Sequence, residues 1–441
     1  MTFLQRNTRK GKGNIPINKH LAKKVKHGQI IQDLPLISYN DSLVSLFTVI
    51  PATTLVDNSK KLIVHGHYTR HIISSYGIIE IPVTYWKSTD PTEDTQYYTD
   101  LIIGVTGSAN YSDEYMEKQK YVRYEGKASL WNTRRCGEIY TYRLTDSTGR
   151  APCPTTLWNH EQKEGKKAFA QLLSQEVPLT NGSLYIDGYW VKDGWRKYIE
   201  KQIGRRLTLR EWKKLRYKII YAVATEDKVI LDFQITNIRP SYLELIPLFN
   251  RIKKRFSNEQ IQKIVSDEDY AIIDGVQRVF PNVTHGFCVF HQLKKVTRKY
   301  LDEFKKMDNI PKNETIIYEL AQALITAENV IESTGLLNQI KKIASRVTLS
   351  KASQKVIEYV DTVYHKNRKL LEHGFVPETN NVMEQLFSFI ADFVNQARSF
   401  KQENSLKHFF SNLFSLGNKR AFNTGSSRGL SPLDRARLHP G

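Results

Sequence analysis

Short runs of alternating apolar and polar residues, separated by clusters of turn residues, dominate positions 31–180. The stretch from Lys60 to Ser88 is rich in Ile, Val and Tyr on both sides of a Ser-Tyr-Gly turn, and it predicts two strands. The stretch GEIYTYRLTDSTGR, residues 137–150, predicts another strand followed by a loop. A loop and a helix are expected over residues 153–175. We therefore expect a β-rich or α+β region at 31–180.

A different order of elements begins near residue 183. Apolar runs of strand length alternate there with amphipathic stretches of helical period. The predicted order is a strand (183–191), a hairpin of two strands (217–225 and 229–236), a helix (241–256), a strand (262–270), a helix (271–280) and a strand (284–290). Because strands joined through helices usually pair in parallel, this order predicts an α/β sheet.

Helical periods without strand signals fill residues 291–373, and two more amphipathic helices are expected within 377–393 and 405–423. The chain therefore divides into five predicted parts. They are a flexible basic arm (1–30), the N-terminal region (31–180), the first part of an α/β core (181–290), an α-helical insertion (291–375) and the final helices of the core with a basic tail (376–441).

Composition places the chain among folded proteins with a polyanionic partner. Apolar residues make up 40% of it, and no apolar run is long enough to predict a transmembrane helix. The N-terminus lacks the apolar stretch of a signal peptide, and three cysteines do not form a disulfide framework, so we expect an intracellular protein. The 65 Lys and Arg against 45 Asp and Glu give a net charge of +20, and nucleic acid is the usual partner of such an excess.

The positive charge is concentrated in two segments. Residues 1–30 carry eight Lys and Arg and no acid, and residues 192–218 carry eleven Lys and Arg against three acids, with aromatic residues between them. The second segment is either a solvated helical face or a surface that contacts phosphates. The candidate contacts are Arg196, Lys197, Arg205, Arg206, Lys213 and Lys214.

Three carboxylates in the predicted core are candidates for one shared site. Asp187 lies inside the first strand, Asp267 ends a later strand, and Glu384 lies in the first turn of a helix that follows the insertion. If the strands are neighbours and the helix covers the sheet, the three carboxylates converge. Such oxygen ligands suit Mg²⁺, and two ions about 4 Å apart can clamp both oxygens of an in-line phosphoryl transfer.

Each carboxylate also has a purely structural explanation. Asp187 precedes a glycine, which is common in turns, and the acids of the SDED stretch at 266–269 can cap the next helix. Asn380 or Asn381 can cap the helix that contains Glu384, and Asn381 with Glu384 three residues later fits a capping box. Asp274 is expected on a helix surface. These alternatives stay open at this level.

The residues around the carboxylates resemble DDE transposases of the Mutator-like type. The resemblance rests on the ordered stretches YIDGYW, VSDEDYAIIDGVQRVFPNVTHGFCVFHQLKKV and ETNNVMEQLFS, and it extends over about 183–435, including LSPLDRA near the end. The separations between the three acids, 80 and 117 residues, suit an insertion before the last one. The positions that match the family pattern are Asp187, Asp267, Ala271, Phe280, Pro281, Cys288, His291, Thr379, Asn380, Asn381 and Glu384.

This resemblance implies an RNase H-like fold: a mixed sheet flanked by helices, with an α-helical insertion. It implies two Mg²⁺ ions, replaceable by Mn²⁺, on Asp187, Asp267 and Glu384. The implied activity is cleavage at the ends of a mobile DNA element and transfer of the 3′-hydroxyl into target double-stranded DNA. Cys288, His291, Asn380 and Asn381 are then expected to position DNA. Cys288 and His291 alone cannot complete a zinc site, and they can also be a buried cysteine and a helix-capping histidine.

The resemblance also implies partners and a location. A dimer or larger assembly would bring two DNA ends together, and the protein would be DNA-associated in the cytoplasm, or in the nucleus of a eukaryotic host. The N-terminal half shows no helix-turn-helix or zinc motif, so recognition of element ends is assigned to the β-rich region without a motif. The alternatives are a structure-specific nuclease, a non-catalytic DNA-binding descendant of a transposase, and an RNA-binding protein.

Overall fold

The computed structural model divides the chain into two compact units, residues 1–160 and 161–441. It describes residues 37–39, 42–44, 48–56, 61–75, 77–90, 97–106, 110–145, 151–192, 196–237, 240–256, 259–304, 310–396, 403–423, 425 and 427–438. The predicted basic arm at 1–30 lies outside these residues. Each unit is described by itself.

The first unit combines small antiparallel sheets with helices. β4 (Leu62–Ser74) and β5 (Gly77–Ser88) form the predicted hairpin, and β6 (Tyr97–Thr99) pairs with β5. β1 (Ile37–Tyr39) pairs with β2 (Ser42–Val44), and β3 (Thr48–Ile50) pairs with β7 (Leu101–Ile103). The helices within the unit are α2 (Ala52–Leu55), α3 (Asp113–Tyr124) and α4 (Leu130–Thr145), and α5 (Pro154–Ser174) crosses into the second unit.

The predicted strand at the start of 137–150 is wrong, because α4 continues through it to Thr145. Packing of α3 against α4 explains the difference. The Tyr115 hydroxyl donates to the carbonyl of Gly137 over 3.3 Å, and a Cβ at Gly137 would lie 2.8 Å from that hydroxyl. An ion pair between Arg134 and Glu138 at 2.7 Å adds support at helical spacing. Tertiary contact therefore overrides the β-like composition of this stretch.

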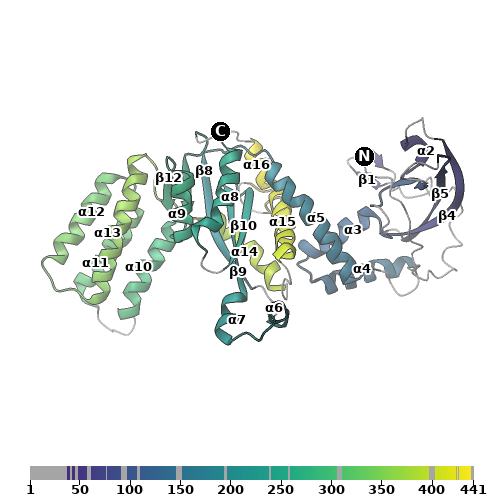
Figure 1. Cartoon of the computed structure of the whole chain (residues 1–441). Helices are drawn as coiled ribbons and strands as arrows, with labels where there is room; N and C mark the ends of the chain where they lie inside the picture. The colour runs from purple at the N-terminus through teal and green to yellow at the C-terminus, as the bar shows by residue number, and fades with distance from the viewer. Residues whose placement is uncertain are drawn as a thin grey trace. The chain divides into compact units, whose positions relative to one another are not determined.

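A five-stranded mixed sheet forms the centre of the second unit, in the order β10-β9-β8-β11-β12 (Figure 1). β8 is parallel to β11, which is parallel to β12, whereas β9 and β10 are antiparallel to their neighbours. The predicted hairpin and the predicted parallel pairs are both confirmed. The strands are β8 (Ser183–Lys192), β9 (Tyr217–Thr225), β10 (Ile230–Asn237), β11 (Lys263–Ser266) and β12 (Thr284–Phe287).

Helices pack against the sheet and bury its apolar side chains. α8 (Tyr242–Arg255) and α9 (Tyr270–Val279) share one core with Leu184, Ile186 and Ile264. The two helices approach closely, since a Cβ on Gly275 would lie 2.5 Å from the Phe249 ring. Successive side chains of a strand alternate in direction, so Tyr185 and Asp187 point to the opposite face of the sheet from this core. α14 (Asn381–Gln396) contacts β8, and α15 (Glu403–Lys419) contacts β10.

The predicted helical insertion is present and has a core of its own. It comprises α10 (Val289–Phe304), α11 (Lys312–Thr326), α12 (Val330–Ala344) and α13 (Lys351–Glu372). The remaining helices are α6 (Arg196–Ile203) and α7 (Leu209–Leu215), which follow β8, and α16 (Pro432–Leu438) near the C-terminus (Figure 1). Among the described residues, no helix has both the length and the apolar character needed to cross a membrane.

Candidate active site

Asp187 and Asp267 are neighbours because of the register of the parallel strands. Ile186 pairs with Ser266, and each aspartate is the next residue along its chain. Neighbouring strands lie about 4.8 Å apart, so the two carboxylates leave adjacent points of the sheet. Asp187 is inside β8, whereas Asp267 comes directly after the end of β11. Both positions agree with the sequence expectation for these residues.

The start of α14 is fastened to the same end of the strands. The side-chain amide of Asn380 donates to the carbonyl of Ile186 over 3.1 Å, and its backbone N–H donates to the Cys288 thiol over 3.2 Å. Seven residues after Asn380, the ring of Phe387 lies 5.2 Å from that of Tyr189 on β8. These contacts bring Glu384, which is in the first turn of α14, near enough to Asp187 to help raise its pKa, but ligand atoms of Asp187, Asp267 and Glu384 do not all lie within 4.8 Å of one another.

The capping box expected from Asn381 and Glu384 is wrong. α14 begins at Asn381, and the carbonyl of Asn380 accepts hydrogen bonds from the backbone N–H groups of Met383 at 3.0 Å and Glu384 at 3.2 Å. Asn380 therefore occupies the N-cap position, which places Glu384 one residue too far along for the box. The Asn380 side chain is turned to Ile186 instead of to its own helix.

Asp187 is the carboxylate on which the other two act most clearly. Asp187 is only 9% exposed. Burial and the nearby Asp267 and Glu384 carboxylates raise its pKa to about 7, although the backbone N–H of Gly188 donates to Oδ1 at 2.7 Å. Burial also raises the pKa of Asp267, against the opposing effect of His291. Oδ1 of Asp267 is buried and has no hydrogen-bond partner among the described residues.

This arrangement fits a divalent cation. The donors of the three residues are carboxylate oxygens, which Mg²⁺ prefers, and one buried oxygen is open for a ligand. A cation would also offset the burial that raises the pKa of both aspartates and the like-charge repulsion that adds to it at Asp187. Asp187, Asp267 and Glu384 are thus the residues of this site that could hold Mg²⁺.

The three consecutive acids after β11 have three different environments. Asp269 caps α9, because its Oδ1 accepts from the backbone N–H of Ala271 at 2.8 Å, and its Oδ2 accepts from the Tyr221 hydroxyl at 2.7 Å. The expected capping by this stretch is confirmed for Asp269. Asp274 is exposed on α9, as expected.

Glu268, between Asp267 and Asp269, binds the helical insertion. Its carboxylate accepts from Lys295 on α10 at 2.7 Å and from Tyr359 and Lys366 on α13 at 2.7 and 2.9 Å. Burial alone would raise its pKa, but the three donors outweigh burial and lower it. Sequence reasoning missed this role, because the partners are 27, 91 and 98 residues away.

Cys288 and His291 lie beside Glu384. Cys288 follows β12 and is fully buried, and burial raises the pKa of its thiol. His291 lies in the first turn of α10, and its Nδ1 is buried without a hydrogen-bond partner among the described residues. One potential ligand atom from each of Cys288, His291 and Glu384 lies within 4.8 Å of the other two.

A second polar network fixes the loop before α14. The Glu378 carboxylate accepts from Lys263 Nζ at 2.6 Å and from the Tyr185 hydroxyl at 3.0 Å, and its carbonyl accepts from the backbone N–H of Val289 at 3.0 Å. The side chain of Lys263 is only 5% exposed. Tyr185, Lys263 and Glu378 were not singled out by the sequence patterns, since each takes its role from a distant partner.

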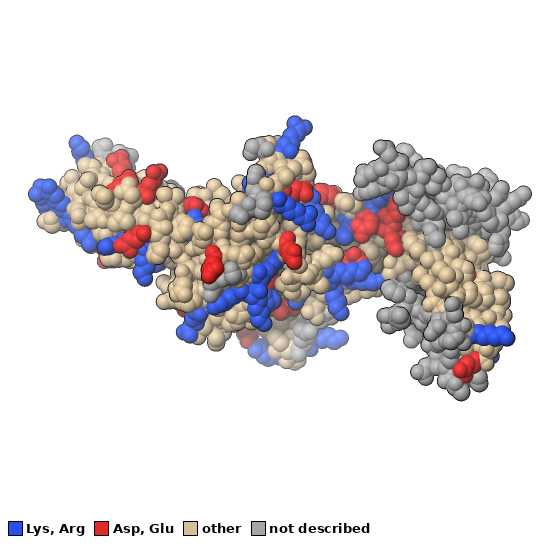
Figure 2. Space-filling view, turned by 90° about the horizontal axis from the view of Figure 1, so that it is seen from above, with Lys and Arg blue, Asp and Glu red and all other residues tan. Residues whose placement is uncertain are grey.

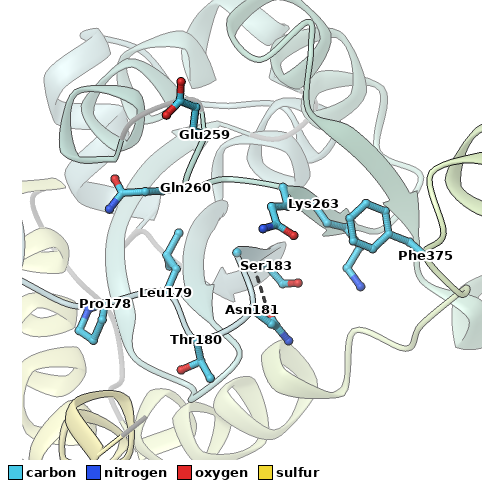
Figure 3. Close-up of a pocket in the computed structure, with 11 residues that line it drawn as sticks. Pro178, Leu179, Thr180, Asn181, Ser183, Glu259, Gln260, Lys263 and Phe375 are labelled. Carbon is cyan, nitrogen blue, oxygen red and sulfur yellow. Dashed lines mark hydrogen bonds between the residues drawn. The ribbon is translucent and has the colours of Figure 1, made fainter. Parts of the chain in front are cut away.

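The main cavity near this network lies at the other end of the sheet from the carboxylates. It has a volume of about 540 Å³ and lies where β8 and β11 begin (Figure 3). It contains none of the predicted catalytic residues. Its walls come from residues 178–183, from Glu259, Gln260, Gln262 and Lys263, and from Phe375.

The predicted phosphate contacts lie on α6, α7 and the turn between them. Arg196 pairs with Glu200 at 3.0 Å and Arg205 with Glu211 at 2.6 Å, so part of their charge is neutralised within the segment. Lys197 and Arg206 are exposed, and the side chains of Lys213 and Lys214 lie outside the described part. Lys and Arg are also prominent on the face seen from above in Figure 2, so positive charge is spread over more than one surface.

Comparisons with known proteins show a similarity to one family over a short segment of the chain. No curated protein sequence matches the chain. Among solved structures, the Drosophila P element transposase strand transfer complex is similar at a TM-score of 0.36 and 10% identity, over 68% of this chain and 90% of that one. Residues 235–295 match the family model of the MULE transposase domain, a segment that includes Asp267, Cys288 and His291. The resemblance to Mutator-like transposases is therefore confirmed.

Proposed function

We propose that this chain is a DDE transposase that cleaves DNA at the ends of a mobile element and joins the freed 3′-hydroxyl to target DNA. The observations that carry the proposal are the adjacent positions of Asp187 and Asp267 on paired strands, the effect of Asp267 and Glu384 in raising the pKa of Asp187, and an open buried oxygen on Asp267. The strand order β10-β9-β8-β11-β12, with three parallel strands and an antiparallel hairpin, supports an RNase H-like core. The family match over 235–295 supports the same class of enzyme.

Asp187, Asp267 and Glu384 would hold two Mg²⁺ ions, with Mn²⁺ as a substitute. When bound, such ions supply activation of the attacking oxygen and stabilisation of the leaving oxygen of the phosphodiester. The chain contributes orientation. Gly188 fixes one oxygen of Asp187, and Asn380 ties the start of α14 to β8, so that Glu384 faces the strand ends. Because the chemistry uses water and a DNA hydroxyl, it needs no covalent enzyme intermediate.

Contacts with DNA are assigned to exposed residues around the site. Lys197 and Arg206 on the basic segment can bind backbone phosphates, and exposed Asn381 can reach DNA near Glu384. Asn380 and Cys288 are fully buried, so we assign them to positioning α14 instead of contacting DNA. Joining two element ends to one target requires a dimer or larger assembly on double-stranded DNA.

Recognition of element ends is assigned to the first unit. On its β4–β5–β6 sheet, Tyr85 and Tyr97 stack with ring centroids 5.4 Å apart, and Lys87 Nζ lies 5.9 Å from the Tyr97 ring. An aromatic group next to a lysine is a surface that nucleic acid can contact. The sheet therefore offers a testable surface for this role.

The test is cleavage of labelled duplex DNA that carries the sequences flanking this gene, with Mg²⁺ or Mn²⁺. The wild type is compared with Glu384→Gln, which keeps the side-chain shape and removes the charge. Asp274→Asn is the matched control, because it makes a similar change on an exposed face of α9. The proposal predicts cleavage and strand transfer by the wild type and the control, and DNA binding without cleavage by Glu384→Gln.

Other products would decide between the alternatives. Cleavage without strand transfer would indicate a structure-specific nuclease. Salt-dependent DNA binding without cleavage by the wild type would contradict an enzyme and favour a non-catalytic DNA-binding protein.

A further inference from the structure

We propose that Cys288, His291 and Glu384 form a second metal site, for a borderline divalent ion such as Zn²⁺, which shares Glu384 with the magnesium site. The three residues come from three elements: the end of β12, the first turn of α10 and the first turn of α14. Their potential ligand atoms lie within 4.8 Å of one another. Among the described residues this is the one such group of three or more His, Cys, Asp or Glu side chains.

The spacing suits a tetrahedral ion after a small adjustment. With zinc–ligand bonds of about 2.0–2.3 Å, tetrahedral ligand atoms lie roughly 3.3–3.8 Å apart. Because the three atoms lie within 4.8 Å of one another, they need to approach by at most about 1–1.5 Å, which side-chain rotation can supply. A fourth position stays open for water or a DNA oxygen, as in zinc sites with three protein ligands.

His291 supplies the second, independent observation. Its Nδ1 is buried and has no hydrogen-bond partner among the described residues, which is costly for a polar atom. His285, on the neighbouring strand, shows the usual arrangement, because its Nε2 lies 2.8 Å from the Ser266 hydroxyl. A metal at the Cys288–His291–Glu384 site would bind one of the two ring nitrogens of His291, of which Nδ1 is buried without a hydrogen-bond partner among the described residues.

The donor set separates this site from the magnesium site. A thiolate and an imidazole favour Zn²⁺ over Mg²⁺, which prefers oxygen ligands. Cys288 already accepts a hydrogen bond from the backbone of Asn380, so a metal there would also fix the start of α14. Metal binding by the site does not depend on catalysis.

The consequence for activity rests on the proposed function. Zn²⁺ on Cys288 and His291 would take one oxygen of Glu384, and its positive charge would weaken binding of a second cation through the other oxygen at Asp187 and Asp267. Zinc is therefore expected to inhibit magnesium-dependent cleavage by occupying the neighbouring site.

The test is a titration of the full-length reduced protein with Co²⁺, which reports a thiolate ligand by a charge-transfer band. The wild type is expected to show the band at one ion per chain. Cys288→Ser should remove the band, and His291→Gln should weaken Co²⁺ binding by roughly tenfold or more. Cys153→Ser is the matched control, since Cys153 is an exposed free cysteine, and it should leave the band unchanged. Circular dichroism and melting curves show that each variant is folded.

Absence of the band in the reduced wild type, or its persistence in folded Cys288→Ser, would overturn the site. Asp187→Asn distinguishes a failure of the proposed zinc site from a failure of the proposed function. This variant should keep the cobalt band while losing DNA cleavage. In the cleavage reaction, with each protein's rate divided by its own zinc-free rate, Zn²⁺ should inhibit the wild type at concentrations that do not inhibit Cys288→Ser. Equal inhibition of both proteins would overturn the sharing of Glu384, whereas a cobalt band in a protein that never cleaves DNA would contradict only the proposed function.

Discussion

Asp267 and Glu268 are neighbours in the chain, and the fold treats their carboxylates in opposite ways. Glu268 is surrounded by Lys295, Lys366 and Tyr359, which lower its pKa. Asp267 lies beside Asp187, its pKa is raised, and one of its oxygens has no partner among the described residues. The three donors around Glu268 outweigh its burial, whereas at Asp267 burial and Asp269 outweigh the opposing effects of His291 and Lys295.

The difference separates acids that serve the fold from acids that serve a ligand. A buried carboxylate that repels its neighbours destabilises the folded chain, and such an arrangement is typical of functional sites. A carboxylate that joins β11 to α10 and α13 stabilises the position of the insertion. Asp267 and Glu268 are consecutive residues, so neither their burial nor their position in the sequence distinguishes the two roles.

The largest expected effect is that of Asp187→Asn on cleavage. Removing this ligand should lower the rate of DNA cleavage by roughly 1,000-fold or more, while DNA affinity is kept. Without divalent cations at pH 8, the same change should raise the free energy of unfolding by about 1–3 kcal/mol, because it removes like-charge repulsion. Urea denaturation measures the second effect, and a loss of stability of similar size would contradict the role assigned to Asp187.

The pH dependence of stability follows from the same carboxyl group. The pKa of Asp187 is about 7 in the folded protein and near the usual value of about 4 when unfolded, so the folded state holds the proton more tightly. Stability is therefore lost as the pH rises through 7. Without metal, the unfolding free energy of the wild type should fall by about 1 kcal/mol between pH 6 and pH 8, and Asp187→Asn should reduce this slope.

Glu268→Gln should have the opposite effects from Asp187→Asn: it should lower stability and leave DNA cleavage nearly unchanged. The change leaves Lys295 and Lys366 without their shared carboxylate, and both are partly exposed, so the expected loss of unfolding free energy is about 2–3 kcal/mol. Cleavage per folded molecule should stay within a few-fold of the wild type. A variant that is as stable as the wild type but inactive would reverse the comparison between the two neighbouring acids.

Glu378→Gln should give a smaller, mixed effect. It removes the charge that pairs with buried Lys263 and loosens the loop before α14, so we expect a loss of about 1–2 kcal/mol in stability and roughly tenfold in cleavage. Glu372→Gln, on an exposed pair with Arg368, is the control and should change neither quantity. Equal behaviour of the two variants would exclude a positioning role for Glu378.

The smallest effects are expected on the basic segment. Lys197→Ala and Arg206→Ala should each weaken DNA binding a few-fold and reduce the slope of log affinity against log salt by about one unit. Lys342→Ala, an exposed lysine on α12, serves as the control. If Lys197→Ala and Arg206→Ala leave the slope of log affinity against log salt unchanged, α6 and the turn after it are excluded as a phosphate-binding surface.

Local patterns predicted the core of the second unit because its strands and helices follow their own periodicity. The order from β8 to β12 and the placement of Asp187 and Asp267 could be read in this way. The helix α4 could not be predicted from the sequence, because its contact with Tyr115 outweighs the β-like composition of the segment. The roles of Glu268 and Glu378 could not be predicted either, since their partners are distant in the chain. Of the two cap candidates, Asn380 and Asn381, the structure uses Asn380, whose side chain is bound to β8, so the capping box with Glu384 does not form.

Binding of Mn²⁺ is the measurement that tests the contrast between the two regions most directly. Free Mn²⁺ can be followed by its electron paramagnetic resonance signal as it is added to the wild type, Asp187→Asn and Glu268→Gln. The account predicts that the wild type and folded Glu268→Gln bind Mn²⁺, and that Asp187→Asn binds it at least about tenfold more weakly. Equal binding by all three proteins would contradict a metal site at Asp187, Asp267 and Glu384.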